Sequence, residues 1–477
     1  MENIIAQQLV KMQGEILGKI RENGLQNIGQ TAEALFQVVK TETCELLKAI
    51  LEATDNEIAN AKAERKASGL RVKERDVKRR LQTSLGEIEY GRTYYETQEG
   101  ERIYLLDHLI GVESYERVSK ALCAKLVNLS AEMSYGKSVR VGEAEVSRQT
   151  VSNKVNALRE VVRDVERVNE TPEVLHIFAD EDHVHLKDGR SAIVPLVTIA
   201  EGIDASNPKR HRLINPLHIA GYGMDAEAFN DQAEACVNER YDLNQVKRIY
   251  IHGDGASRIV ALGERFPNAE HVLDGFHLEK YLKKLGHYNG AAQRMGALRA
   301  ALREGNWKTY KKLLGNIYTL QTGKDRERCK DVIRYLWHNR QAAHLRYDSD
   351  ICGSCTESLV SHVLSERLSR TPLAWSEQGL AKMTMLVVYR KNGRAFSARD
   401  IRVSLNRDEQ SREAALRRSG WDKYNSYMDR QLDLILSADW ASAFEKETVS
   451  FGKVDASFII RKSFGAFRSV VWSPRTT

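Results

Sequence analysis

The chain has 477 residues, of which 42% are hydrophobic and 29% are charged, and its formal net charge is +7. This length is sufficient for two to four domains, each with its own core. Because no run of about 18 apolar residues occurs, the sequence predicts no transmembrane helix, and its beginning lacks the pattern of a secretory signal. We therefore expect a protein of the cytoplasm or the nucleoid.

Residues 1–80 are predicted to form long amphipathic helices, because apolar residues such as Leu9, Met12 and Ile16 recur at helical spacing. Within this region, residues 61–80 contain nine Lys and Arg residues but only three Asp and Glu residues. A basic helix of this kind either follows DNA phosphates or is a solvated surface helix with internal ion pairs. The segment alone does not decide between these alternatives.

Residues 81–106 alternate apolar and polar positions around two glycines, which predicts a small β-hairpin. Arg92, Tyr94 and Tyr95 would lie on this hairpin. A basic side chain beside aromatic rings suits nucleic acid, whereas tyrosines on a strand more often simply pack against a core.

Residues 107–170 return to a helical pattern, and residues 141–162 among them resemble a helix-turn-helix. Small residues precede Val146, and Ser147 would cap a second helix that begins at Arg148. Short matches of this kind also arise by chance. The second helix would present the following side chains to base edges or phosphates: Arg148, Gln149, Ser152, Asn153 and Lys154.

Residues 174–280 predict an α/β domain. Its order of elements is β-β-β-α-β-α-β, which is the order of an RNase H-like domain, where three antiparallel strands precede parallel strands with right-handed crossovers. Residues 278–346 are then helical and rich in Lys and Arg. The elements are expected at 174–179, 191–200, 212–220 (strands), 225–242 (helix), 247–253 (strand), 256–266 (helix) and 269–276 (strand).

Three acidic residues are predicted to converge on this sheet. Asp180 directly follows the first apolar strand and Asp254 ends the fourth, and these strands are neighbours in this topology. Glu357 lies near the start of a helix in residues 351–369 that would pack on the same face. A few converging carboxylates suffice to bind Mg²⁺, and two such ions promote in-line displacement at a phosphodiester.

Each of these residues also has a plainer interpretation. An Asp after a strand often caps a turn or a helix, and Glu357 would be an ordinary surface residue in that case. Asp182 is an alternative to Asp180 as the ligand. His183 and His185 alternate as on a strand, which suits a strand face near the phosphate better than a zinc site without a Cys or Glu partner.

Seven motifs together resemble the ISLre family of bacterial insertion-sequence transposases, which look related to the Mutator-type DDE transposases. The resemblance covers roughly residues 80–400. Its motifs are G-R-T-Y-Y (91–95), Y-L-L-D (104–107), V-S-R-Q-T-V (146–151), F-A-D-E-D-H-V-H (178–185), H-G-D-G-A (252–256), L-D-G-F-H (273–277) and the stretch from T-E-S-L-V to L-A-W-S (356–376).

Under this resemblance, Asp180, Asp254 and Glu357 match the DDE triad. Asp274 and His277, which follow the last strand and would orient the site or contact DNA, match the C/D-x-x-H signature between the second Asp and the Glu. Glu357 lies 103 positions after Asp254. This gap leaves room for the helical insertion with which such relatives help to bind transposon ends.

The resemblance implies an enzyme that uses two Mg²⁺ ions, with Mn²⁺ as a substitute, and works as a homo-oligomer on double-stranded DNA. It would bind terminal inverted repeats through residues 141–162, nick their 3′ ends and join them to target DNA. Trp375 or Trp337 would stack on an unpaired base near the cut or simply pack in a core. The alternatives are an RNase H-like nuclease without strand transfer and an inactive DNA-binding regulator derived from a transposase.

We therefore expect a multidomain α+β protein whose RNase H-like core is interrupted by an all-helical insertion and preceded by helical and helix-turn-helix regions. The expected regions are 1–80 (N-terminal helices), 81–125 (β-hairpin and helix), 126–170 (helix-turn-helix), 171–285 (first part of the core), 286–345 (helical insertion), 346–400 (second part of the core, with the Glu helix) and 401–477 (C-terminal region).

Overall fold

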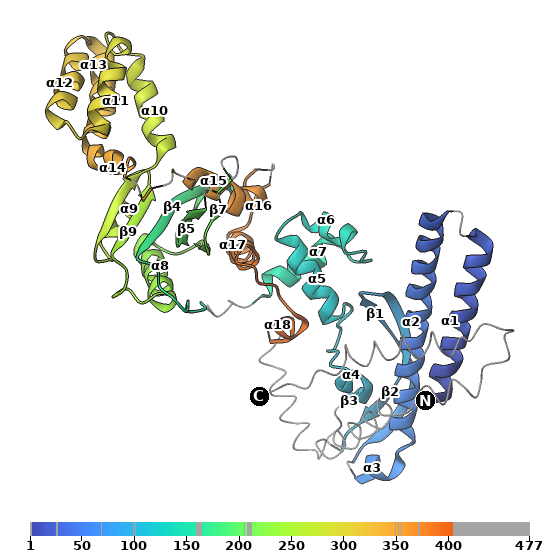
Figure 1. Ribbon diagram of the computed structural model, residues 1–477. Helices are drawn as coiled ribbons and strands as arrows, with labels where there is room; N and C mark the ends of the chain where they lie inside the picture. Colours follow the sequence, from blue (N-terminus) through green and yellow to red (C-terminus); the bar gives the residue numbers. More distant parts are fainter. Residues whose placement is uncertain are drawn as a thin grey trace. The chain divides into compact units, whose positions relative to one another are not determined.

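The computed structural model describes residues 2–403 except 25–26, 68, 99, 101, 159–164, 205, 208–211, 349, 352, 354 and 371–372. Most of the expected C-terminal region 401–477 therefore lies outside the described residues. The protein is a mixed α/β molecule with two compact units (Figure 1). Unit 1 comprises Met1–Leu126, Val139–Ser147 and Ser397–Thr477, and unit 2 comprises Val127–Ser138 and Arg148–Phe396. None of the described helices has the length and apolar character needed to cross a membrane.

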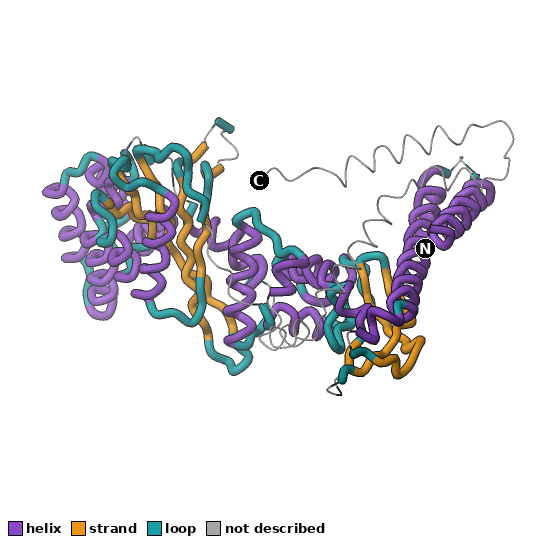
Figure 2. The backbone as a smooth tube through the Cα atoms, turned by 90° about the horizontal axis from the view of Figure 1, so that it is seen from below, coloured by secondary structure: helices purple, strands orange, loops and turns teal. Residues whose placement is uncertain are grey.

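Unit 1 is built on a pair of long helices, α1 (Glu2–Asn23) and α2 (Ile28–Asn60), followed by the short helix α3 (Lys62–Ala67). A β-sheet packs against α2 (Figure 2). Side chains of α2, both long strands and α4 share a core that includes Leu51, Leu81, Ile88 and Leu106. The elements after α3 are β1 (Arg71–Thr83), β2 (Gly86–Glu96), β3 (Arg102–Ile103) and α4 (Leu105–Leu109).

The prediction of a basic helix is wrong for residues 71–80, because these residues belong to strand β1. Pairing with β2, from Arg71 opposite Glu96 to Thr83 opposite Gly86, decides the conformation. Exposed cations of β1 face carboxylates of the same sheet, as in the Lys73–Glu96 pair at 2.7 Å. The strand is therefore a largely ion-paired surface, closer to the solvated alternative than to a phosphate-tracking helix.

Arg92 and Tyr95 of the G-R-T-Y-Y motif are buried parts of unit 1, and the nucleic-acid interpretation of these two residues is wrong. The ring of Tyr95 is fully buried, and the guanidinium of Arg92 lies 3.6 Å from the ring centroid of Tyr104. Arg92 and Arg79 both form ion pairs with the buried carboxylate of Asp107, with 2.6 Å between Arg79 Nη1 and Asp107 Oδ2. Two guanidiniums thus depend on one anion that is shielded from water.

Helices α5 (Lys120–Ser130) and α6 (Tyr135–Val141) each span a border between the units in the sequence, and α7 (Arg148–Asn156) begins the longer segment of unit 2.

Unit 2 contains a five-stranded mixed sheet with the order β10-β9-β4-β5-β8. Its strands are β4 (Val174–His185), β5 (Ser191–Ala200), β8 (Leu217–Ala220), β9 (Arg248–Gly253) and β10 (Ala269–Leu273). Strands β4, β5 and β8 are antiparallel neighbours, while β9 runs parallel to β4 and β10 runs parallel to β9. The expected strand at 212–220 is divided, because β7 (Arg212–Leu213) leaves the sheet to pair with β6 (Ile203–Asp204).

Helices α8 (Ala226–Arg240) and α9 (Ser257–Gly263) cover one face of this sheet. Leu175, Ile177 and Ala179 of β4 point into their common core, which also holds Phe229 and Ile259. Because side chains alternate along a strand, the even-numbered residues of β4 face the other side, where α15 contacts β4.

A helical segment lies between β10 and α15, as expected, and has its own core of residues such as Leu278, Leu298, Tyr310 and Leu336 (Figure 1). The helix that carries Glu357 is interrupted by a π-helical turn, η2 (Ser361–Ser365), between α15 (Thr356–Val360) and α16 (Glu366–Leu368). The other helices are α10 (Gly275–Gly286), η1 (Ala292–Arg294), α11 (Met295–Arg303), α12 (Trp307–Thr319), α13 (Gly323–His338), α14 (Arg340–Leu345), α17 (Glu377–Lys391) and α18 (Ala398–Val403).

We predict that Asp107→Ala lowers the free energy of unfolding by about 3–5 kcal/mol, because it leaves two buried guanidiniums without their anion. Urea-induced unfolding measures this change. Glu89→Ala is the matched control, since Glu89 pairs with Arg80 at the exposed surface of the same sheet, and it should change stability little. Equal effects of the two substitutions would show that the buried cluster does not hold unit 1 together.

Candidate functional site

The parallel pairing of β4 with β9 brings Asp180 and Asp254 together. Phe178 is the register partner of His252, so Asp180 and Asp254 each follow this pair by two residues. The expectation that Asp180 ends its strand is wrong, because β4 continues to His185 through its pairing with β5. Asp180 instead lies where β9 ends and β4 loses its parallel neighbour.

Glu357 reaches the same place from the first turn of α15, which contacts β4. Burial, helped by the negative charges of Glu357 and Asp254, raises the pKa of Asp180 to about 6, while the hydrogen bond from the Glu181 N–H and the nearby His277 act in the opposite direction. These electrostatic effects require the four side chains to be neighbours. The charges of two predicted carboxylates and of one predicted supporting residue thus act on Asp180.

Short hydrogen bonds fix the loop that carries Asp254. Its Oδ1 accepts from the backbone N–H of Ala256 at 2.8 Å, and the Tyr335 hydroxyl donates to its carbonyl oxygen at 2.8 Å. Gly255 has a φ of +83°, and a Cβ there would lie 2.6 Å from Asn339 Oδ1, so only glycine fits. The turn-capping role of Asp254 thus exists alongside its position in the site.

Asp274 joins the end of β10 to the end of β9. Its backbone N–H donates to the carbonyl oxygen of Gly253 at 2.8 Å, and its Oδ1 accepts from Phe276 N at 2.6 Å at the start of α10. Asp274 is therefore a helix cap that holds the neighbouring strand, while His277 on the first turn of the same helix is the residue close to Asp180. This arrangement supports a positioning role for the pair.

The three carboxylates form an acidic cluster that no cation neutralises among the described residues: no ion pair there involves Asp180, Asp254 or Glu357. Within the same residues, no group of three or more His, Cys, Asp or Glu side chains is arranged closely enough to hold a metal ion. Glu357 is exposed at the first turn of α15. The carboxylate oxygens of these residues are the type of ligand that hard divalent cations prefer.

The alternative ligand Asp182 is already engaged. Both of its carboxylate oxygens accept from the hydroxyl of Ser369 at 2.9 Å, and the side chain is buried. His183 and His185 are exposed, and by strand alternation they lie on the face opposite Asp180. These histidines therefore do not share the strand face that carries Asp180.

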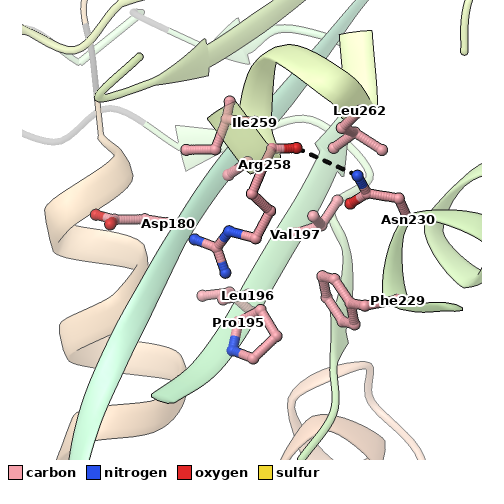
Figure 3. A pocket seen from close by; sticks show the side chains of 10 residues that line it. Asp180, Pro195, Leu196, Val197, Phe229, Asn230, Arg258, Ile259 and Leu262 are labelled. Atoms are coloured by element: carbon pink, nitrogen blue, oxygen red, sulfur yellow. Dashed lines mark hydrogen bonds between the residues drawn. The ribbon is translucent and has the colours of Figure 1, made fainter. Parts of the chain in front are cut away.

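Figure 3 shows the other side of β4, where Pro195, Phe229 and Arg258 line a small pocket and Asp180 points away from them. The pocket has a volume of about 10 Å³, room for a single water molecule. Arg258 forms an ion pair with Glu181 at 2.7 Å on this face. This pocket is too small for a ligand larger than water.

Trp375 is a core residue. Its side chain is buried, its indole N–H donates to the carbonyl oxygen of Leu368 at 2.9 Å, and the Arg367 guanidinium lies 4.8 Å from its ring centroid. Trp337 is partly buried against the core of the helical insertion, with Arg340 4.2 Å from its ring. Packing accounts for both tryptophans.

The sequence analysis missed a buried pair of histidines beneath the site. His176 Nδ1 lies 3.0 Å from His252 Nε2, and both rings belong to a stack with Phe178. Burial lowers the pKa of His252 to about 3 and also lowers that of His176, so both rings are neutral at pH 7. The only available signal was a histidine in each of two neighbouring apolar strands.

All the predicted DNA-binding residues lie on α7, which begins at Arg148 as expected. Val151 and Val155 are buried, while Arg148, Gln149 and Asn153 are exposed and Lys154 is half-buried. Gln149 Nε2 donates to Asn153 Oδ1 at 2.8 Å. Residues 159–162, the end of the proposed helix-turn-helix, lie outside the described residues.

Comparison with known proteins gives a family match over most of the chain. A profile described as "Uncharacterised protein family (UPF0236)" matches residues 21–404. UPF0236 protein TTE2489 of Caldanaerobacter subterraneus subsp. tengcongensis is 34% identical over 386 residues, which cover 80% of this chain and 82% of the relative.

Two further relatives carry the same family description. One, from the same organism, has a name that joins eleven locus designations and is 34% identical over 401 residues, or 82% of this chain and 84% of the relative. "UPF0236 protein in vanSb 3'region" of Streptococcus gallolyticus is 25% identical over 330 residues, or 65% and 71%.

We predict that Asp180→Asn stabilises the protein above pH 6. Because the folded-state pKa of about 6 exceeds the ordinary value of 3.8, the folded state binds this proton more tightly. The resulting stabilisation is complete below about pH 4 and is lost as the pH rises through 6. At pH 7 the variant should be more stable than the parent by about 1–3 kcal/mol, and the gain should disappear at pH 4.

Thermal unfolding between pH 4 and pH 8 checks this prediction. Asp188→Asn is the control, since the pKa of exposed Asp188 is lowered by its hydrogen bonds with Arg190 and its substitution should not stabilise at pH 7. A gain from Asp180→Asn that does not depend on pH would contradict the electrostatic explanation.

Proposed function

The chain belongs to the UPF0236 family, and we propose that this member is a DNA transposase of the DDE type, similar to the ISLre transposases. The observation that carries the proposal is the placement of Asp254 and Glu357 near Asp180, a buried carboxyl group whose pKa is raised first by burial and then by these two charges. Repulsion between carboxylates lowers the free energy of unfolding. A group of side chains that is kept despite this loss is a candidate functional site.

The topology of unit 2 supports an RNase H-like interpretation. Three antiparallel strands precede two parallel ones, and the first and fourth strands, β4 and β9, are neighbours at the centre of the sheet. The carboxylates follow the point where β9 ends, which is where open α/β sheets place their ligands. The helical insertion then separates Asp254 from Glu357 in the sequence.

Asp180, Asp254 and Glu357 would hold two Mg²⁺ ions, or Mn²⁺ in their place. When bound, these ions supply charge neutralisation at phosphorus and stabilise the attacking and leaving oxygens. The residues of the chain do the positioning: Asp274 and Tyr335 hold the ends of the strands and the Asp254 loop. His277 places a ring N–H near Asp180 on the side from which DNA would enter.

One site suffices for two successive reactions. Water would first attack the phosphodiester at the end of the element and release a 3′-hydroxyl. That hydroxyl would then attack a phosphodiester of the target DNA, so that one bond forms as another breaks. Both attacks need the same charge compensation, and the carboxylates would act on both strands in turn.

Charge supports DNA as the partner. Residues 275–347, the helical insertion with α10, contain 16 Lys and Arg residues but five Asp and Glu residues, although the whole chain has a net charge of only +7. The exposed Arg148 and Asn153 on α7 provide side chains that suit base edges and phosphates. A homo-oligomer on the nucleoid would bind the terminal repeats through α7 and would bind further DNA phosphates through the basic helical insertion.

The relatives add an independent argument. The name of one relative joins eleven locus designations of a single genome, and the names of two others join four and two. One protein encoded at many loci is what an element that copies itself leaves behind. A nuclease without strand transfer or an inactive DNA-binding regulator gives no reason for such numbers.

We predict that Glu357→Gln and Asp254→Asn each reduce Mg²⁺-dependent cleavage of terminal DNA by at least about a thousandfold, because each removes an anionic ligand. Binding of the same DNA should be nearly unchanged. Glu366→Gln is the matched control, since Glu366 lies on the same helical segment but pairs with His362 and Lys391. The assay should use both an intact end and a pre-nicked end.

The two substrates separate the alternatives. Cleavage of the intact end without joining of the pre-nicked end to target DNA would favour a plain nuclease. Loss of cleavage in Glu366→Gln but not in Glu357→Gln would show that the third ligand is misassigned. Binding without any reaction in the parent protein would favour the regulator.

A separate prediction concerns α7. Arg148→Ala should weaken binding to terminal DNA and reduce the slope of log K against log salt by about 1, because one phosphate contact is lost. Lys247→Ala is the control: it removes an exposed cation before β9, at the end of the strand opposite Asp254. An unchanged slope in Arg148→Ala would remove α7 from the DNA interface.

A further inference from the structure

A cavity of about 740 Å³ opens beside Glu357 in unit 2. Its wall includes the start of α10, the first turn of α15 and the π-helical turn η2. Cavities of roughly 300–1,000 Å³ are typical of small-ligand sites, so this one is large enough for a nucleotide. The three carboxylates alone do not explain it.

Phe276 gives the cavity an exposed aromatic surface. Its side chain is 54% exposed although it lies in the first turn of α10, between the cap Asp274 and His277. The ring of His277 meets it edge-on, with 5.4 Å between centroids and an angle of 87°. Lys280 Nζ lies 5.9 Å from the ring centroid. A large ring left open to solvent beside cationic groups is suited to stacking on a nucleic-acid base.

Two arginines line the same cavity. Arg346 Nη1 is buried and makes no hydrogen bond within the described residues. Its guanidinium occupies the space beside Gly275, where a Cβ would lie 2.2 Å from Nη1. The side chain of Arg370 is 61% exposed, and its Nη1 is 3.8 Å from Glu366 Oε1. Guanidinium groups bind phosphate oxygens with paired N–H donors.

The acidic residues on the wall are Asp274, Glu279 and Glu357, and the first two have partners of their own. Arg299 binds both oxygens of Glu279 at 2.5 and 2.7 Å, and Asp274 caps α10. The cavity thus combines an open ring, donors for phosphate, and direct access to Glu357.

We propose that this cavity binds an unpaired nucleotide of a DNA strand, with its base stacked on Phe276 and its phosphates held by Arg346 and Arg370. The inference rests on the proposed function in one respect, the placement of this nucleotide at a DNA end beside the reacting phosphate. A base can stack here only after it leaves its own helix. The site would therefore select frayed or extended ends over fully paired ones.

The test uses short duplexes of arbitrary sequence that carry a single-stranded extension, on the 3′ or the 5′ strand, with 2-aminopurine in the extension. The parent protein should bind one of the extended duplexes about tenfold more tightly than the blunt duplex and change the 2-aminopurine fluorescence. Phe276→Ala should lose both the preference and the fluorescence change, and Phe276→Trp should retain both. Tyr115→Ala is the matched control, because Tyr115 is 98% exposed and lies in unit 1.

Arg370→Ala tests the phosphate contact at a largely exposed side chain. It should weaken binding of the extended duplex severalfold and reduce its salt dependence, while the fluorescence change at saturation persists. Equal affinity of the parent protein for blunt and extended duplexes would overturn the proposal. A preference that survives in Phe276→Ala would also overturn it, as would equally tight binding of free 2-aminopurine riboside monophosphate.

Failure of this inference is distinguishable from failure of the proposed function. If metal-dependent cleavage requires Glu357 but the protein shows no preference for extended ends, the proposed transposase activity stands and the proposed nucleotide subsite is rejected. A preference that depends on Phe276, together with no cleavage, would support the subsite and contradict the transposase.

Discussion

The parallel pairing of β4 with β9 is the constraint on which the candidate site depends. Backbone hydrogen bonds hold His176 opposite Tyr250 and Phe178 opposite His252, and each of the two carboxylates follows the second of these pairs by two residues. Neither aspartate contributes to this pairing. The attraction between the strands, and the packing of Ile177 and Ile251 beneath them, therefore outweighs the repulsion between side chains that would separate in an isolated chain.

Two buried histidines near Asp180 and Asp254 do not neutralise these carboxylates. His176 and His252 lie in the same layer, but burial keeps both rings uncharged. Arg258, the nearest guanidinium in the sequence to Asp254, is turned to the opposite face of the sheet and binds Glu181. Among the described residues, Asp180 therefore forms no ion pair with a basic side chain, although His277 lies near it.

Much of the sheet could be predicted because its strands are local apolar runs: 191–200 agrees with β5, and Asp225 caps α8 as a residue of its type should. The failures concern segments whose conformation depends on distant partners. Residues 71–80 are so basic that they suit a helix, yet pairing with β2 makes them a strand. The apolar run ends at Ala179, yet pairing with β5 extends β4 to His185. The cavity beside Glu357 was not predictable, because Phe276, Arg346 and Arg370 come from three separate segments.

The π-helical turn at Ser361–Ser365 has a consequence for how this segment varies among related chains. A π turn contains one residue more than the α-helical turn it replaces, so removal of one residue from it would restore a regular helix. The part that follows, with Leu368 in the core, would then be rotated by about 100° relative to Glu357. Homologues that align with a one-residue gap in this turn should therefore have a compensating insertion nearby or a different acidic residue in place of Glu357.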